Sequence, residues 1–419
     1  TNVVSLLIPD EYTITDDIFV IKDFLNITYE IETDEIEIED KNEVELEDLV
    51  IDKSIDNEQE YIRNFIIEDK KLKEYVGYTE NVIIPEGLVT EISSGAFKNS
   101  NIVSVTIPQD IKIIRNRCFE GCGKLKEVVM GDGVKTIGSY AFTGCDELKR
   151  VKLSNKLTSI GDYAFSRCKN LIEIDFPLSL EKIGDYAFSR CSSLRNIFIP
   201  ENVSSIDSYT FRDCTAVSKV LVDKNNIYYD SRDNCNAIIE KDNDKLIFAC
   251  KNATIPEGVK SIGEYAFASL TEFNIVIPAS VTNISSEAFF ECDKISSISV
   301  DFNNKVYDSR ENCNGIIETE TNTLLFGCSK TIIPDGIAAI ERHAFYKCDD
   351  LKSITIPASV KRVGANAFES CKNLKEIIIC CKRKAFRFIP PGYQEYFYDK
   401  NSCPNVVLRW KDVDTNKIL

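Results

Sequence analysis

A 23-residue period constrains the fold more than any other feature of the sequence. Seven cysteines mark it in two runs: Cys122, Cys145, Cys168, Cys191 and Cys214, then Cys348 and Cys371. Aligned at this interval, the segments share the pattern C-x-x-L-x-x-I-x-I-P-x-x-V-x-x-I-G-x-x-A-F-x-x. Such self-similarity indicates a repeat architecture in which each copy is one structural unit.

Less regular copies extend the series. Residues 72–99, 100–121 and 270–291 keep the apolar positions, and two expanded copies, 214–269 and 292–347, have 56 residues each. The expanded copies share an insertion of two apolar runs joined by polar residues, which is typical of a β-hairpin. Counted together, the copies predict about ten coils.

The apolar spacing within one copy predicts how a coil is built. The segment L-x-x-I-x-I alternates at its end and is rich in β-branched residues, which favours one short strand that ends at the proline. V-x-x-I places a second apolar pair inward, and G-x-x-A-F forms a tight turn or a single helical turn whose phenylalanine enters the core. Because one coil cannot bury its apolar side alone, neighbouring coils must stack copy on copy. The predicted fold is a β-rich solenoid.

The repeated I-P-x-x-V-x-x-I-G-x-x-A-F-x-x-C resembles the BspA-type leucine-rich repeat of anaerobic bacterial surface proteins and mucosal protozoan parasites. The doubled D-S-R-[DE]-N-C-N-[AG]-I-I-E also resembles an insertion often seen in that family. The resemblance covers about residues 72–379. It implies a right-handed superhelix with one short strand per coil on a concave sheet, short helical turns elsewhere and two hairpin insertions. It also implies secretion or surface display and binding of host or matrix proteins, without catalysis.

The pattern divides the chain into three predicted regions. Residues 1–71 lack it and alternate Ile, Val or Leu with Glu over residues 29–49, which predicts an acidic β-rich N-terminal region or cap. Residues 72–379 form the solenoid. Residues 380–419, with Trp410 in a strand-like NVVLRW, form a C-terminal cap. Caps are expected because the end coils of a solenoid would otherwise expose the core.

The charge distribution argues against several classes of protein. The formal charge is −17, and residues 1–80 hold 24 acidic and 7 basic residues, so the rest of the chain carries equal numbers of each. A nucleic-acid-binding protein needs a net positive surface, which this chain lacks. No run of about 18 apolar residues predicts a transmembrane segment. Because no initiator methionine is present, any signal peptide or anchor is expected outside the given sequence.

The residue inventory also argues against catalysis. His343 is the only histidine, so a Ser/His/Asp or Cys/His site has one available base, and a zinc site with several imidazoles cannot form. It occupies the slot where other copies carry Tyr140, Tyr163, Tyr186 and Tyr265, which favours a structural or surface role. No carboxylate pair, nucleophile or cofactor motif stands outside the repeat. We therefore expect no catalytic, cofactor-binding or metal-binding residues.

The cysteines of the repeat are expected to be reduced core thiols: Cys122, Cys145, Cys168, Cys191, Cys214, Cys292, Cys348 and Cys371. Stacked copies lie about 4.8 Å apart, whereas a disulfide needs Cβ atoms about 3.8 Å apart, and a linear ladder does not converge on a metal. Cys235/Cys250 and Cys313/Cys328 bracket the hairpins. A disulfide across each hairpin fits an oxidising compartment, but their place inside the solenoid favours free thiols.

Each insertion also contains a D-S-R motif, at residues 230–232 and 308–310. A ligand site or a cation clamp would fit these residue types. Asp and Ser before a hairpin more often cap a turn through bonds from side chain to backbone, which favours a turn-stabilising role.

The outward positions of L-x-x-I-x-I are the best candidates for binding, because they vary between copies while the core positions do not. They combine a basic triplet with acidic and apolar residues: Lys126, Glu127, Lys149, Arg150, Lys152, Glu173, Asp175, Arg195, Phe198, Lys219 and Leu221. Strands of a solenoid line one face that repeat proteins use for partners, and this mixture suits a protein surface. An ordinary solvated sheet surface would show the same residue types.

The leading hypothesis is a non-enzymatic, extracellular or cell-surface repeat protein, monomeric and without a cofactor. It would bind a protein or glycan ligand of a host surface, matrix or neighbouring cell through the concave sheet, and would bind no nucleic acid. A structural spacer with no ligand on the solenoid is the alternative, and an enzyme is the remotest hypothesis.

Overall fold

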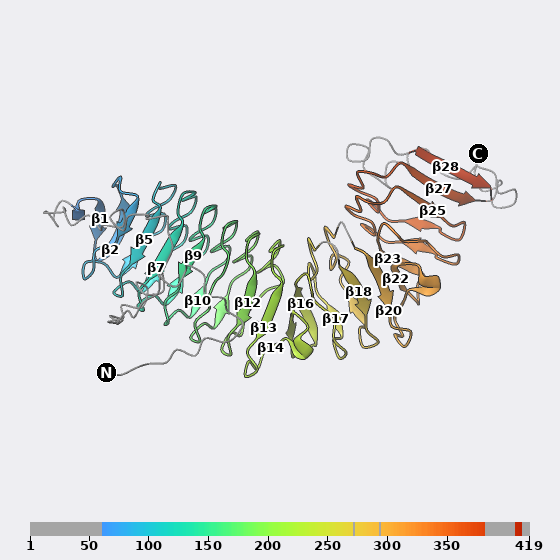
Figure 1. The fold of residues 1–419 in the computed structure, drawn as a ribbon, viewed down its shortest axis with the longest axis horizontal. Coiled ribbons are helices and arrows are strands. Elements are labelled where there is room, and N and C mark those ends of the chain that lie inside the picture. Colours follow the sequence, from blue (N-terminus) through green and yellow to red (C-terminus); the bar gives the residue numbers. More distant parts are fainter. Residues whose placement is uncertain (1–60, 271–272, 293–294, 382–406, 413–419) are drawn as a thin grey trace, which may run out of the picture. The chain divides into compact units, whose positions relative to one another are not determined.

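The structure is a computed structural model that describes residues 61–270, 273–292, 295–381 and 407–412. These residues form a β-solenoid of about thirteen turns of about 23 residues, with almost no helix (Figure 1). The predicted solenoid and the two hairpins within it are confirmed. The acidic segment at residues 29–49 lies outside the described residues, so the predictions for it, and the boundary at residue 71, stay predictions.

The longer strands of successive turns pair in parallel along one side of the solenoid. They form four sheets: β3 (Asn81–Ile83), β5 (Ser104–Ile107), β7 (Glu127–Met130) and β9 (Arg150–Lys152); β12 (Asn196–Ile199) and β13 (Lys219–Val222); β18 (Asn274–Ile277) and β20 (Ser297–Val300); β25 (Ser353–Ile356), β27 (Glu376–Cys381) and β28 (Val407–Asp412). Burial alternates along these strands, as in β12, where Ile197 and Ile199 are buried and Asn196 and Phe198 are exposed. We call the outward side of these sheets the strand face.

A second set of sheets joins the two-residue strands of the regular turns to strands of four or five residues at the N-terminal end of the solenoid and in the insertions. The first contains β1 (Phe65–Glu68), β2 (Lys71–Tyr75), β4 (Glu91–Ile92), β6 (Ile113–Ile114), β8 (Thr136–Ile137), β10 (Ser159–Ile160) and β11 (Lys182–Ile183). The second contains β14 (Tyr229–Asp230), β15 (Ala237–Glu240), β16 (Lys245–Ala249), β17 (Ser261–Ile262) and β19 (Asn283–Ile284). The third contains β21 (Tyr307–Asp308), β22 (Gly315–Glu318), β23 (Thr323–Gly327), β24 (Ala339–Ile340) and β26 (Arg362–Val363). Each insertion also holds a short 3₁₀ helix, Arg232–Asn234 or Arg310–Asn312.

One detail of the predicted coil was wrong, and of the two forms predicted for G-x-x-A-F the tight turn is confirmed, in place of the short helical turns that the resemblance implied. Most regular coils hold two strands instead of one, because the inward isoleucine of V-x-x-I, such as Ile137, lies in a two-residue strand that pairs with both neighbouring turns. The G-x-x-A-F segment forms turns and no helical turn. It does not continue as a helix because alternate amides bond across turns: Phe142 N donates to the carbonyl oxygen of Ala164, one coil later, at 2.7 Å, whereas Ala141 N donates within the turn to the carbonyl oxygen of Gly138 at 3.3 Å.

The predicted count of about ten coils was too low, because each expanded copy contributes an extra turn. Strand β16 of the first hairpin pairs in parallel with β17, with Leu246 opposite Ile262, and β23 pairs with β24 in the same way. Leu246 and its counterpart Leu324 are fully buried. The hairpins therefore supply core residues to the stack of short strands and do not project from it.

Two backbone positions in most regular turns are left-handed. One precedes Ala-Phe, as at Tyr163 (φ 57°). The other precedes the cysteine that recurs once per repeat, which we call the ladder cysteine, as at Arg167 (φ 65°) and Gly144 (φ 73°). For a residue with a side chain, this conformation costs energy, and glycine avoids that cost. Hydrogen bonds to the next turn offset the cost, since Tyr163 N donates to the carbonyl oxygen of Asp185 at 2.9 Å and Arg167 N to that of Ser189 at 2.8 Å.

A stack of phenylalanine rings fills the core. Phe119, Phe142, Phe165 and Phe188 are fully buried, and successive ring centroids are 4.9, 5.0 and 5.3 Å apart with the planes within 7° of parallel. These separations match the spacing of paired strands, about 4.8 Å, so one ring per turn packs against the next. The predicted inward role of the phenylalanine is confirmed.

Both ends of the strand face have structural partners. Tyr61 Oη donates to the carbonyl oxygen of Ile83 at 2.9 Å and accepts from Ile83 N at 2.8 Å, which occupies edge groups of β3 that would otherwise invite pairing with another chain. At the other end β28 pairs with β27, so the strand predicted in NVVLRW is confirmed for Val407–Asp412. Residues 382–406 and 413–419 of the predicted cap lie outside the described residues.

We expect Phe165→Ala to lower the free energy of unfolding by about 3–5 kcal/mol, because it removes a buried ring that packs on both neighbouring turns. Urea unfolding followed by circular dichroism would measure the loss. Phe302→Ala is the matched control: Phe302 is 91% exposed, so its removal should change stability by less than about 0.5 kcal/mol. Equal losses in the two variants would contradict the role assigned to the ring stack.

Candidate functional site

The ladder thiols belong to the core and form no reactive site. Cys168 Sγ donates to the carbonyl oxygen of Phe142 in the preceding turn at 3.3 Å, and Cys145 makes the equivalent bond to Phe119 at 3.2 Å. Both thiols are buried, and burial raises their pKa well above the ordinary range, so they stay protonated donors. The described cysteines are free, including both hairpin pairs.

We expect the buried thiols to resist alkylation in the native protein. Burial raises the pKa of Cys122 to about 12, so almost no thiolate exists at pH 8, and the thiolate is the form that reacts. Among the cysteines whose burial the structure describes, half-buried Cys380 should be modified first, since burial raises its pKa but leaves the sulfur partly accessible. Peptide mass mapping after iodoacetamide treatment, with and without denaturant, measures how fast Cys122 and Cys380 are alkylated.

Denatured protein without reductant should take up label on all sixteen cysteines. Native labelling of Cys168 at the rate of the denatured chain would contradict its burial. A mass deficit at Cys235/Cys250 or Cys313/Cys328 would mean that the hairpins carry disulfides.

The D-S-R motifs stabilise turns, as predicted. Asp230 accepts hydrogen bonds from the backbone amide and the guanidinium of Arg232, and Ser231 Oγ accepts from Val222 N at 3.0 Å. Asp308 and Arg310 repeat the arrangement in the second insertion. These polar groups are therefore engaged within the fold.

His343 occupies the left-handed backbone position that tyrosines occupy in other turns, as its sequence slot predicts, with φ of 58°. Its ring is half-buried, 5.3 Å from the ring of Tyr346, with Nε2 3.6 Å from a carboxylate oxygen of Glu369. Burial lowers its pKa, which favours the neutral imidazole near pH 7. Because aromatic packing and one carboxylate account for its surroundings, a structural role describes it best.

The first group of predicted binding residues gathers on β7 and β9 of the strand face. Register places Arg150 opposite Glu127 and Lys152 opposite Val129. Lys149 and Arg150 are exposed, whereas Lys152 and Glu127 are half-buried. Lys126 is exposed and lies 3.9 Å from Glu147 in an ion pair. The basic triplet is thus one local patch.

The second group lies on β12 and β13. Phe198, 44% exposed, is opposite half-buried Leu221, and exposed Lys219 is opposite Asn196. Arg195 precedes β12 and is also exposed. This group therefore places an aromatic ring and an aliphatic side chain beside two cations.

Glu173 and Asp175 lie between these groups, but not on a strand as predicted. Residues 171–177 keep the alternation of buried and exposed side chains without the strand hydrogen bonds. The break coincides with Phe176, whose ring fills the slot that Met130 and Ile199 take in other turns and lies 5.4 Å from the Phe188 ring. The strand face is therefore interrupted, and its two groups belong to separate sheets.

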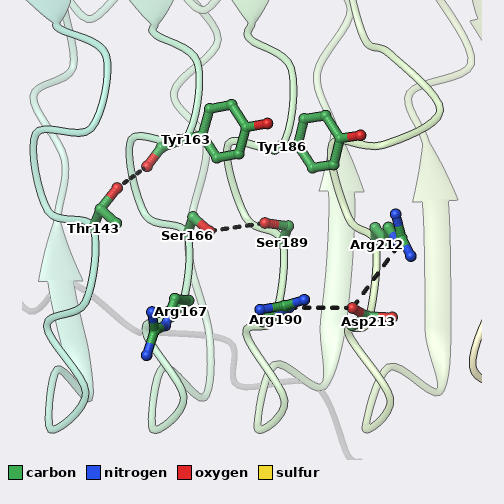
Figure 2. Close-up of a pocket in the computed structure, with 9 residues that line it drawn as sticks. All are labelled: Thr143, Tyr163, Ser166, Arg167, Tyr186, Ser189, Arg190, Arg212 and Asp213. Carbon is green, nitrogen blue, oxygen red and sulfur yellow. Dashed lines mark hydrogen bonds and ion pairs between the residues drawn. The ribbon is translucent and has the colours of Figure 1, made fainter.

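A pocket that sequence reasoning missed lies in the turn segments, away from the strand face. Figure 2 shows the rings of Tyr163 and Tyr186 on one side of a bond between Ser166 and Ser189, and Arg167 and Arg190 on the other side, with Arg212 and Asp213 at the end of the pocket. Its volume is about 310 Å³. The signal in the sequence was the recurrence of Tyr before Ala-Phe and of Arg before Cys in adjacent copies. We call this site the arginine–tyrosine pocket.

Two further features are absent from the described residues. Within these ranges, no helix is long and apolar enough to cross a bilayer. The same part of the chain contains no group of three or more His, Cys, Asp or Glu side chains arranged to hold a metal ion.

Comparison with known proteins places this geometry in context. The family described as "BspA type Leucine rich repeat region" matches in six copies over residues 45–144, 112–238, 246–322 and 317–407. A leucine-rich cell surface protein from Faecalibacterium prausnitzii has a similar crystal structure, with 27% sequence identity, a TM-score of 0.56, and coverage of 77% of this chain and 94% of that one. No sequence among curated proteins matches the chain.

A leucine-rich repeat protein from Eubacterium ventriosum is similar in fold. Its crystal structure has 22% sequence identity and a TM-score of 0.51, and the match covers 71% of this chain and 86% of that one.

Proposed function

The chain belongs to the family of BspA-type leucine-rich repeat proteins, and from that premise we propose that it is a non-catalytic binding protein of the cell surface. Its partner would be a protein of a host surface, a matrix or a neighbouring cell. The crystal structure from Faecalibacterium prausnitzii is of a cell surface protein, which supports the proposed location.

The composition of the strand face is the observation that carries the proposal. Its inward positions repeat from turn to turn, while its outward positions change, from Ser104 to Glu127 to Arg150 in one slot and from Phe198 to Leu221 in another. The core needs only the inward residues, so the outward ones are free to form a surface that recognises a partner.

The two groups on this face offer different kinds of contact. Lys149 and Arg150 supply exposed positive charge, which speeds encounter with an acidic protein surface. Phe198 beside Leu221 supplies apolar area of the kind that anchors protein interfaces. A catalytic function has less support, because the candidate nucleophile and base groups, the thiols and His343, are held in structural roles.

Charge reversal of the basic triplet tests the proposal. We expect wild-type protein to bind at least one member of a panel of purified extracellular-matrix proteins, and Lys149→Glu/Arg150→Glu/Lys152→Glu to weaken that binding about tenfold or more, mainly through slower association. Biolayer interferometry would measure both rates. Lys135→Glu/Lys156→Glu/Lys182→Glu is the matched control, because these exposed lysines lie near the short strands, away from the strand face.

Phe198→Ser tests the apolar group in the same assay, with Phe302→Ser as control for loss of an exposed ring. We expect only Phe198→Ser to weaken binding. If no matrix protein and no cell surface binds the wild-type chain, the proposal fails and the structural spacer is the better description. An equal loss from the lysine control would place the interface elsewhere.

A further inference from the structure

The arginine–tyrosine pocket carries more positive charge than the fold uses. Arg190 Nε lies 3.5 Å and Arg212 Nε 4.0 Å from the same oxygen of Asp213, so two guanidinium groups share one carboxylate. The other oxygen of Asp213 accepts a hydrogen bond from Ser269 Oγ at 2.6 Å. Arg167 is exposed and has no ion pair within the described part of the chain. The pocket thus has a net excess of two positive charges.

The backbones of Arg167 and Arg190 and the guanidinium of Arg212 are held in position before any ligand arrives. Arg167 and Arg190 have left-handed backbones, with φ of 65° and 62°, and their amides bond to the next turn at 2.8 and 2.7 Å. The guanidinium of Arg212 lies 4.4 Å from the centroid of the Tyr265 ring, a cation–π distance. Fixed donors lose little conformational entropy on binding, which favours recognition of an anion.

The tyrosines beside the arginines present edges and not faces. The rings of Tyr163 and Tyr186 stack 4.7 Å apart at 4°, and both continue a row that runs from Tyr140 to Tyr209 with separations of 4.8 Å. Because each inner ring is covered on both faces, a ligand meets hydroxyl groups that recur once per turn. The buried hydroxyls of Ser166 and Ser189, 2.8 Å apart, form a polar floor between tyrosines and arginines (Figure 2).

This pattern selects one class of ligand. Guanidinium groups pair well with planar or tetrahedral oxyanions such as carboxylate, phosphate and sulfate, and donors that recur along a line fit a ligand whose acidic and hydroxyl groups recur as well. A single-stranded nucleic acid needs exposed aromatic faces, which the stacked rings do not offer, and a net positive protein. An acidic peptide could be recognised by the arginines alone, whereas the recurring tyrosine hydroxyls and the polar serine floor also match a ligand that is rich in hydroxyl groups.

Acidic groups next to the tyrosines limit where such a ligand can lie. Asp162 and Asp185 precede Tyr163 and Tyr186, and Asp162 Oδ1 accepts a hydrogen bond from Asp185 N at 3.1 Å. Both carboxylates contribute to the raised pKa of Tyr163 after burial and the neighbouring tyrosines, so they lie close enough to its hydroxyl to repel an anionic group there. The ligand is therefore confined to the arginine side, where it runs along the solenoid.

We infer that the arginine–tyrosine pocket binds an acidic polysaccharide, with Arg167 and Arg190 contacting its carboxylate or sulfate groups and Tyr163 and Tyr186 contacting its hydroxyls. This site is separate from the strand face, so the protein would hold a glycan and a protein partner on different surfaces. The inference does not depend on the function proposed above.

Binding of defined polymers to the full chain tests this site. We expect heparin or polygalacturonate to bind and neutral dextran not to bind, by isothermal titration calorimetry at low salt. Arg167→Asn/Arg190→Asn should weaken binding about tenfold or more and reduce its salt dependence. Asparagine is chosen because it tolerates a left-handed backbone, as Asn99 (φ 58°) does at the equivalent position of an earlier turn.

Matched variants make the outcome decisive. Lys135→Asn/Lys156→Asn removes the same charge from exposed lysines near the short strands and should weaken binding less than about threefold. Tyr163→Phe/Tyr186→Phe keeps the ring stack and should weaken binding a few-fold. Thermal unfolding of each variant checks that the fold is kept.

Three results would overturn the inference: no binding of either acidic polymer, equal losses in the arginine and lysine variants, or equal affinity for polyglutamate or single-stranded DNA. Charge reversal of Lys149, Arg150 and Lys152 on the strand face should leave polysaccharide binding unchanged. A failure of the proposed polysaccharide site can therefore be distinguished from a failure of the protein-binding role proposed for the strand face.

Discussion

Stacking of one turn on the next is the interaction on which the rest of the structure depends. The turn segment donates its amides across coils, as Phe142 N does to Ala164 O, so a coil without a neighbour would leave these groups unpaired. The same contact brings the phenylalanine rings to about 5 Å and lets each ladder thiol reach the carbonyl of the preceding turn. Hydrogen bonds, ring packing and thiol burial therefore share one spacing, that of paired strands.

The shared spacing also explains why the exposed side chains can form binding surfaces. Each turn repeats its inward residues, so its outward residues appear at the same place on every coil and form lines along the solenoid. The strand face carries one such line, which passes through Glu127 and Arg150. The turn segments carry the tyrosine row and the arginine pair, where left-handed backbones fix the direction of the side chains. Two chemically different surfaces thus arise from one repeat.

Several features could be predicted because they depend on periodicity alone. The solenoid, the inward phenylalanine, the buried cysteines and both hairpins follow from which slots recur. The second strand per coil and the extra turn in each insertion did not follow, because they depend on hydrogen bonds such as those between β16 and β17. The break at residues 171–177 was also missed, since a phenylalanine in an aliphatic slot keeps the pattern of the sequence while its bulk changes the packing. The arginine–tyrosine pocket was missed because two recurring slots had to be placed side by side.

By itself, the sequence determined that the chain stacks similar coils around an apolar core, because a fixed period of inward residues can be buried in no other way. It also determined which side chains face outward on the longer strands. Only the tertiary structure decided which of those side chains become neighbours, where the strand face is interrupted, and which cations lack a carboxylate of their own. Contacts between turns join residues about 23 positions apart, and whether such residues meet is set by backbone register and ring volume, which a pattern of apolar slots does not contain.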